Sequence, residues 1–218
     1  MTLLVVVAHP DDVTIGAGGM LTALVAVEDV HVVQLTEDAA RADEARRALL
    51  FANVNDVRTL GCPDQEAVYY VRELTEQLRA IIEELRPSTI VTTAYEGGHP
   101  DHDACAMIVQ TLGQAIEMPL YHARNGSFCP LQFADGRDGI IINLDDEQCS
   151  RKRRMLECYT APREELATIP IVTERFRVAP CYDFSLPPHA GALWYEILGF
   201  PIDGATWRRA AADAFAYA

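Results

Sequence analysis

Short apolar runs alternate with amphipathic segments through the N-terminal half of the chain, and this alternation limits the folds open to it. Four runs have the length and β-branched composition of buried strands: 2–8, 31–35, 57–60 and 89–93. Helical apolar spacing marks the segments between them: 15–28, 40–53 and 68–85. Strand–helix–strand repeats form right-handed crossovers and a mostly parallel sheet. We therefore predict an α/β, Rossmann-like three-layer fold.

The pattern weakens toward the C-terminus. We expect a helix over about 103–116, strands at 118–122 and 139–144, and a charged helix at about 145–159. Beyond Pro162 repeated prolines break the pattern, and one last helix is predicted from Thr206 to Phe215. The 218 residues fit one domain. Within it we expect a catalytic core over 1–160 and an irregular C-terminal extension over 161–218, which forms a pocket wall or an interface.

Two clusters of histidine and aspartate follow the first and fourth predicted strands. They are His9-Pro10-Asp11-Asp12 and Gly98-His99-Pro100-Asp101-His102-Asp103. If the strand order is 3-2-1-4-5, these two strands are neighbours where the winding reverses, which is where doubly wound sheets bind ligands. Imidazole and carboxylate groups together are a ligand set for a divalent metal such as zinc. The sequence therefore predicts one metal site at the carboxyl end of the sheet.

Three residues are candidate metal ligands. His9, Asp12 and His102 form a two-histidine, one-carboxylate set, which leaves a coordination position open for water. The competing interpretation makes Asp11 and Asp12 a helix cap with a dipole-matched first turn, and His9 a polar loop residue. The second cluster, at an independently placed strand end, argues against that interpretation.

The remaining members of the clusters are candidates for proton transfer. Asp11 is the candidate general base and His99 the candidate general acid. Asp101 would hydrogen-bond His99 and orient it. Capping of the following helix is the alternative for Asp101, and for Asp103 it is the preferred interpretation.

The two motifs resemble those of the PIG-L/LmbE-like family of zinc-dependent N-deacetylases. The resemblance covers about residues 3–160 and includes weaker pieces: Thr36-Glu37-Asp38, Arg41-x-x-Glu44, Leu60-Gly61-Cys62-Pro63-Asp64 and Lys152-x-x-x-Leu156. It implies a Rossmann-like fold and hydrolysis of an N-acetyl group, usually from the 2-amino position of a glucosamine derivative. It also implies zinc on His9, Asp12 and His102, with Asp11 as base and His99 as acid.

The chain departs from the family pattern at four places. Val13 stands where many members have Glu, but one branch also has Val, so catalysis is not put in doubt. A Gly often follows the Thr-Asp of the second strand, but here the run is Thr36-Glu37-Asp38-Ala39. Glu157-Cys158-Tyr159-Thr160 replaces a His-x-Ser-Gln stretch. Some members have an oxyanion-stabilising tyrosine at the position of Gly97. The oxyanion would here rest on zinc and His99.

Four further residues are candidates for substrate binding. Arg41 and Asp64 follow the second and third strands, so their side chains could reach sugar hydroxyls. An ion pair between Arg41 and Glu44, and a turn at Asp64, are the alternatives. In the tail, Trp194 and Tyr195 suit either sugar stacking or an interface, and the sequence does not choose between them. We predict that one of the two lies within reach of the metal site.

Charge and composition restrict the partners. A net charge of −14 argues against nucleic acid and anionic membranes. Met1-Thr2 leads into a strand without the features of a signal peptide, and no apolar run approaches the roughly 20 residues that span a bilayer. We therefore expect a cytoplasmic protein, and a homo-oligomer stays open. The expected partner is a small N-acetylamino sugar conjugate.

The leading hypothesis is a zinc-dependent N-deacetylase, with Fe²⁺ or another divalent ion as an alternative metal. Two other functions stay open. One is a metal-dependent amidase or esterase acting on a substrate that is not a sugar. The other is a metal-bearing sugar-binding protein without turnover. The glycines 16, 18 and 19 do not form a dinucleotide-binding motif, and close helix–sheet packing explains them better.

Overall fold

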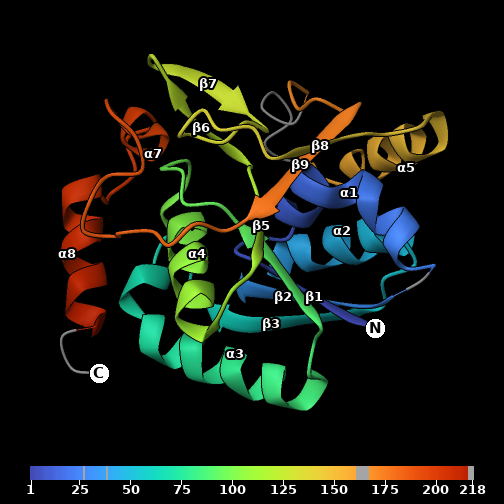
Figure 1. Cartoon of the computed structure of the whole chain (residues 1–218), viewed down its shortest axis with the longest axis horizontal. Helices are drawn as coiled ribbons and strands as arrows, with labels where there is room; N and C mark the ends of the chain where they lie inside the picture. Colours follow the sequence, from blue (N-terminus) through green and yellow to red (C-terminus); the bar gives the residue numbers. More distant parts are fainter. Residues whose placement is uncertain (27, 38, 161–166, 216–218) are drawn as a thin grey trace.

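A seven-stranded sheet in the order β3-β2-β1-β4-β5-β9-β8 forms the centre of the molecule (Figure 1). The computed structural model describes residues 1–218 except 27, 38, 161–166 and 216–218. Five strands run parallel: β1 (Thr2–Val7), β2 (Asp29–Thr36), β3 (Asp56–Cys62), β4 (Thr89–Thr93) and β5 (Ile116–Met118). β9 (Thr173–Val178) pairs antiparallel with β5 and with β8 (Ile140–Asn143). The predicted order 3-2-1-4-5 is confirmed.

Helices cover both faces of the sheet, which confirms the three-layer, Rossmann-like fold. One face carries α3 (Val71–Leu85), α4 (Pro100–Leu112) and α8 (Gly204–Phe215), with the short 3-10 helix η1 (Ala67–Tyr69) before α3. The other face carries α1 (Asp12–Leu24), α2 (Ala39–Leu50) and α5 (Asp146–Leu156). Alternate residues of β1 enter the two cores, because successive strand residues point to opposite faces. Within the described ranges, no helix is long and apolar enough to cross a membrane.

The two strands that carry the histidine clusters are neighbours. β1 pairs in parallel with β4, with Leu3 opposite Thr89 and Val6 opposite Thr92. The chain leaves β1 for α1 on one face and leaves β4 for α4 on the other. The winding therefore reverses between them, and their carboxyl ends open a crevice there. Both clusters lie at this crevice.

The C-terminal half differs most from the sequence-based expectation. The predicted strand 118–122 is divided between the end of β5 and a hairpin of β6 (Tyr121–Arg124) and β7 (Ser127–Pro130). β9 lies in the extension where no strand was expected. Its sequence, Thr-Glu-Arg-Phe-Arg-Val, contains no apolar run that would mark it as a strand. Its buried Glu174 is paired with Lys152, whose Nζ lies 2.7 Å from Glu174 Oε1. α7 (Trp194–Ile197) is a single turn.

Close packing accounts for the glycines in α1. A Cβ atom on Gly19 would collide with Leu144, and one on Gly16 would crowd Met118. Interiors packed at crystal-like density leave no room for such atoms. The packing interpretation is confirmed for Gly16 and Gly19, whereas a Cβ atom on Gly18 would come no nearer than 3.4 Å to Lys152, an ordinary contact.

Candidate active site

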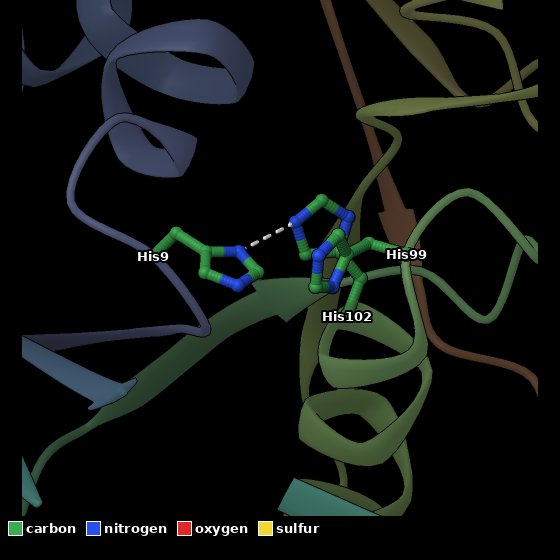
Figure 2. Close-up of side chains that lie close together, drawn as sticks. All are labelled: His9, His99 and His102. Carbon is green, nitrogen blue, oxygen red and sulfur yellow. Dashed lines mark hydrogen bonds between the residues drawn. The ribbon is translucent and has the colours of Figure 1, made fainter. Parts of the chain in front are cut away.

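Three imidazoles meet at the crevice, one from the loop after β1 and two from the start of α4 (Figure 2). His9 Nδ1 lies 3.1 Å from His102 Nε2. Asp12 Oδ1 lies 3.0 Å from His102 Nε2, and Asp12 Oδ2 lies 3.5 Å from His9 Nδ1. Ligands bound tetrahedrally to zinc at about 2.0–2.1 Å are separated by about 3.3 Å. The spacing of these donors, all buried, therefore suits one small divalent cation.

The turn between β1 and α1 positions the carboxylate of Asp12. Its Oδ2 accepts hydrogen bonds from the backbone N–H groups of Ala8 at 3.1 Å and His9 at 2.7 Å. Asp11 stands at the N-cap of α1 but makes no capping hydrogen bond with its side chain. Burial opposes ionisation of Asp12, but the neighbouring His102 and His9 hold its pKa well below the ordinary value. The aspartate pair thus serves the crevice rather than the end of the helix.

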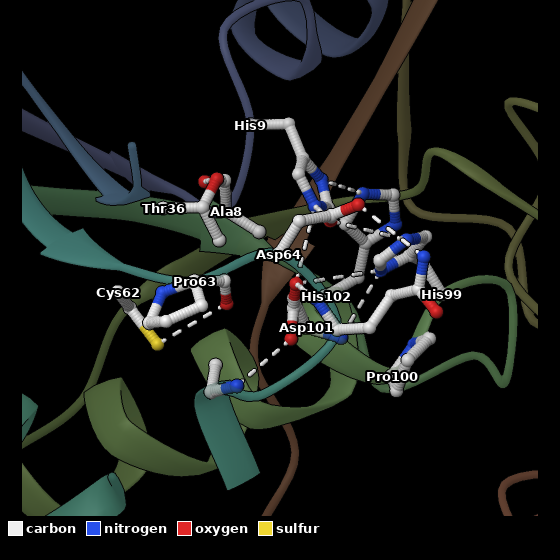
Figure 3. Close-up of polar contacts among 12 residues, drawn as sticks. Ala8, His9, Thr36, Cys62, Pro63, Asp64, His99, Pro100, Asp101 and His102 are labelled. Carbon is white, nitrogen blue, oxygen red and sulfur yellow. Dashed lines mark hydrogen bonds and ion pairs between the residues drawn. The ribbon is translucent and has the colours of Figure 1, made fainter. Parts of the chain in front are cut away.

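Asp64 reaches the same cluster from the turn after β3 (Figure 3). Its Oδ1 lies 3.0 Å from His9 Nε2 and 3.8 Å from His99 Nε2. The hydrogen bond from His9 is the largest cause that lowers the pKa of Asp64 below its ordinary value. The side chain is 55% exposed, whereas the imidazoles are buried. Asp64 therefore lies at the mouth of the cluster, where a ligand would enter.

Burial and charge act differently on the imidazoles. Burial lowers the pKa of His9, but the surrounding carboxylates, Asp12 first, outweigh burial and raise it well above the ordinary value. Burial also lowers the pKa of His99, and the neighbouring His9 and His102 lower it further. The carboxylates thus favour positive charge beside His9. A metal ion would supply such charge, since metal binding displaces protons from its ligands.

Asp101 does not take the position expected for it. Its Oδ2 lies 3.9 Å from His99 Nδ1, beyond hydrogen-bond reach, but 3.3 Å from His9 Nε2. The backbone N–H of Asp101, rather than its carboxylate, donates to His99 Nδ1 at 3.2 Å. The carboxylate instead accepts from the backbone N–H groups of Gln65 at 2.7 Å and Ala67 at 3.0 Å. It therefore joins the turn after β3 to the histidine cluster.

Asp103 also differs from the expectation that it caps α4. The N-cap is His99, whose ring accepts from the Asp101 N–H. The buried Asp103 carboxylate accepts instead from the backbone N–H groups of Glu96 at 3.1 Å and Gly97 at 2.9 Å. It therefore holds the loop that precedes the helix.

Arg41 binds the candidate base. Its Nη2 lies 2.7 Å from Asp11 Oδ2, and its Nε lies 3.9 Å from Glu44 Oε2. Burial and the adjacent Asp12 raise the pKa of Asp11, while Arg41 opposes that rise. Glu44 accepts from the Thr160 hydroxyl at 2.6 Å. The alternative given for Arg41, an ion pair with Glu44, is present, but the closer partner of Arg41 is Asp11.

The family departures at the end of α5 and at Gly97 have visible consequences. Tyr159 donates its hydroxyl to the Pro10 carbonyl at 2.8 Å, so this segment supports the loop that carries the first cluster. Gly97 has φ +68°, and a Cβ there would collide with Leu193. Leu193 thus fills the space beside this position.

Tyr95 donates to the Leu186 carbonyl, in the C-terminal segment. Asp38 of the weaker motif lies outside the described residues.

The tail reaches the site through an aromatic residue that was not among the candidates. Tyr195 is only 1% exposed, so it has no free surface to offer a substrate, and its prediction as a substrate-binding residue is corrected. Trp194 packs on Phe128 of the β6–β7 hairpin. Phe200 lies edge-on against His99 with ring centroids 5.1 Å apart. Sequence reasoning missed Phe200, because Gly199-Phe200-Pro201 matches no motif.

Comparison with known proteins supports a family assignment. A sequence model of the PIG-L family, described as GlcNAc-PI de-N-acetylase, matches residues 4–112, half of the chain. A probable N-acetyl-alpha-D-glucosaminyl L-malate deacetylase 2 of Bacillus subtilis (strain 168) is 30% identical over 144 residues, 56% of this chain and 62% of that protein. The chain spans less than two thirds of the length of the curated relatives it matches, 62% and 66%.

Solved structures share the fold at low identity. The N,N'-diacetylchitobiose deacetylase of Pyrococcus horikoshii superposes with a TM-score of 0.59 at 17% identity, covering 82% of this chain and 84% of that chain. The 4-carboxy-2-hydroxymuconate hydratase of Pseudomonas putida KT2440 gives 0.57 at 13% identity, covering 84% and 97%. The fold therefore carries more than one reaction, and the family rests on the sequence match. On the match over residues 4–112, which includes both histidine clusters, the chain belongs to the PIG-L family.

Proposed function

We propose that this protein is a zinc-dependent hydrolase that removes the N-acetyl group from a small N-acetylglucosaminyl conjugate. One observation carries the proposal: His9, Asp12 and His102 converge with donor atoms 3.0–3.5 Å apart in a member of the PIG-L family. Two proton-transfer candidates, Asp11 and His99, flank this set. The name of the Bacillus relative supports the substrate class.

His9, Asp12 and His102 would hold the metal. Bound zinc would polarise the amide carbonyl and make a water molecule more acidic. Two imidazoles and a carboxylate also suit Fe²⁺ and other divalent ions. Asp64 and Asp101 add negative charge within 3.0–3.3 Å of His9 Nε2, which would further stabilise a bound cation.

Asp11 is suited to accept a proton from the attacking water. Its carboxylate is buried, and its raised pKa brings its basicity closer to neutral pH. The ion pair with Arg41 at 2.7 Å holds the carboxylate in one orientation. Water adds to the amide carbon while Asp11 takes its proton.

His99 is suited to donate a proton to the leaving amine. Because its Nδ1 accepts from the Asp101 N–H, the neutral ring carries its hydrogen on Nε2, the nitrogen that faces Asp64. To act as the acid the His99 ring must first carry a second proton, and the proton that Asp11 takes from the water supplies it. The C–N bond breaks as the amine nitrogen receives a proton from the charged ring, which returns His99 to its neutral form. The products are acetate and the free amino sugar.

An assay of acetate and free amine tests this function. The panel would contain N-acetylglucosamine, N-acetylglucosaminyl malate and an uncharged N-acetylglucosaminyl disaccharide. We expect equal amounts of acetate and amine from at least one of them. Turnover of simple esters or non-sugar amides alone would favour the alternative hydrolase. Sugar binding without release of acetate would favour a binding protein.

A further inference from the structure

A cleft opens beside the imidazole cluster, between the turn after β3 and the segment after α7. Its volume is about 580 Å³, and its walls come from residues 64–66, 69 and 70 and from Pro201 and Ile202. Asp64 joins the cleft to the cluster, since its carboxylate lies 3.0 Å from His9 Nε2. Phe200, which precedes the second wall, contacts His99. A ligand held at the imidazoles would therefore extend into this cleft.

The first wall is attached to the cluster itself. The buried Asp101 carboxylate lies 3.3 Å from His9 Nε2 (Figure 3). It accepts hydrogen bonds from the backbone N–H groups of Gln65 and Ala67. These bonds fix the turn that leads into η1. The cleft is thus preformed relative to the catalytic groups, as expected of a substrate subsite.

Two tyrosines give the cleft its chemistry. Tyr69 is 56% exposed and Tyr70 is 40% exposed, although both are large and partly apolar. Both also line a second hollow of about 610 Å³, on the side of α8. An exposed tyrosine ring offers an apolar face for the C–H surface of a sugar and a hydroxyl for hydrogen bonding. The pair therefore suits a sugar or polyol.

The charged residues along the cleft restrict further the class of ligand that can bind there. Asp64 and Glu66 line the cleft, and none of the described residues along it is a lysine or an arginine, whereas Arg72 and Arg209 line the neighbouring hollow. The two carboxylates would repel a dicarboxylate group such as malate, Glu66 more strongly than Asp64, because His9 Nε2 lies 3.0 Å from Asp64 Oδ1. They would accept an uncharged group rich in hydroxyls.

We infer that the cleft between residues 64–70 and Pro201–Ile202 binds the remainder of the conjugate as an uncharged sugar or polyol, with Tyr69 and Tyr70 as its stacking surface. This inference rests on the proposed deacetylase function and specifies its substrate. It distinguishes this chain from a deacetylase adapted to an anionic conjugate.

Steady-state kinetics of the metal-loaded full-length chain test the subsite. For Tyr69→Ala/Tyr70→Ala we expect the KM for the uncharged disaccharide to rise about 10-fold, with kcat nearly unchanged. The KM and kcat for N-acetylglucosamine should stay within about 2-fold of the wild-type values, because the monosaccharide does not reach the cleft. Tyr69→Phe/Tyr70→Phe should retain most of the affinity, because the rings remain. An equal rise in KM for both substrates would overturn the inference, as would a change of oligomeric state without a change in KM.

Reversing the charge of Glu66 is the second test of the inference. Wild-type protein should prefer the disaccharide over the malate conjugate, and Glu66→Lys should improve kcat/KM for the malate conjugate several-fold. Glu83→Lys, at an exposed site on α3, is the matched control and should not. A wild type that prefers malate, or equal effects of both variants, would overturn the inference.

Disaccharide binding to the Asp11→Asn variant, measured by calorimetry, distinguishes a failure of the subsite inference from a failure of the deacetylase proposal. If no sugar releases acetate but binding still depends on Tyr69 and Tyr70, the deacetylase proposal fails and the subsite stands. If acetate is released but binding ignores both tyrosines, the subsite fails and the deacetylase stands. Loss of both turnover and binding would refute both.

Discussion

At the scale of single residues, His102 is the most informative candidate ligand. Its Nε2 lies near both His9 and Asp12, so its removal would open the donor set. We expect His102→Ala to lose most of about one divalent ion per chain, because a two-ligand remnant binds weakly. Elemental analysis after purification without chelator measures this. His31→Asn, which changes a histidine on β2, should keep the metal; full metal content in His102→Ala would refute the assignment.

Variants of the proton-transfer residues should lose catalytic rate without losing the bound metal. We expect Asp11→Ala and His99→Ala each to lose roughly 100-fold or more in kcat, because each removes a positioned proton-transfer group. Both should keep the metal, since neither belongs to the proposed ligand set. Rates come from acetate release and metal content from elemental analysis of the same samples. Near wild-type turnover of either variant would remove that residue from the mechanism.

Sequence reasoning anticipated the residues of the crevice better than those of its walls. The sequence alone predicted that His9, Asp12 and His102 lie together, because each follows a strand whose neighbour in the sheet was predictable. The direction of a side chain in an irregular tail has no such rule. Tyr195 is therefore buried where exposure was expected, while Phe200, which matches no motif, contacts His99.

At the scale of elements, a buried ion pair joins α5 to β9 and α1. Lys152 Nζ lies 2.7 Å from Glu174 Oε1 and donates to the Ile15 carbonyl at 2.8 Å, and both charged side chains are fully buried. Glu174→Gln would leave the ammonium buried without its carboxylate. We expect the free energy of unfolding to fall by about 3–5 kcal/mol in denaturant titrations.

A surface pair on α5 is the control for that change. Glu147 is 72% exposed where it pairs with Arg151, so Glu147→Gln should cost less than about 1 kcal/mol. If Glu174→Gln is no more destabilising than Glu147→Gln, the buried pair does not hold these elements together.

The edge of β2 and β3 should make stability depend on pH. His31 Nδ1 lies 2.5 Å from Asp56 Oδ2 across the two strands. Burial lowers the pKa of His31, but hydrogen bonds to Asp56 and Asp29 outweigh it and raise the pKa above the ordinary value. Burial raises the pKa of Asp56, but hydrogen bonds from His31 and Arg58 lower it below the ordinary value.

The directions of these two pKa shifts define the pH range in which the His31–Asp56 pair stabilises the protein. The contribution of His31 is complete below about pH 6.5 and is lost as the pH rises through its folded-state pKa. That of Asp56 is present above about pH 4 and is lost as the pH falls through its folded-state pKa. His31→Asn should therefore destabilise the protein more at pH 5.5 than at pH 8.5, as measured by urea unfolding. A loss of equal size at both pH values would show that the pair does not titrate as proposed.

The predictability of an element follows from what buries it. β1 and β2 contribute buried residues to both cores, so apolar, β-branched runs mark them in the sequence. β9 contains Glu174, Arg175 and Arg177, whose charges are satisfied only by distant residues such as Lys152 and Glu117. Such pairing cannot be read from local sequence, and β9 was missed for that reason.

At the scale of the whole molecule, the site is assembled from segments far apart in the chain. The first cluster follows β1, Asp64 follows β3, the second cluster opens α4, and Phe200 comes from the tail. No single segment carries the chemistry. The folded sheet places the groups together, and a metal bound there would in turn stabilise the folded state.

The most direct test of this account is a zinc titration of chelator-stripped, full-length protein, followed by acetate release from the uncharged N-acetylglucosaminyl disaccharide. We predict no activity in the stripped protein and a linear return that ends at about one zinc per chain. His102→Ala should show no return at that ratio. Full activity without metal, or no acetate from any sugar in the panel after zinc is restored, would contradict the central claim.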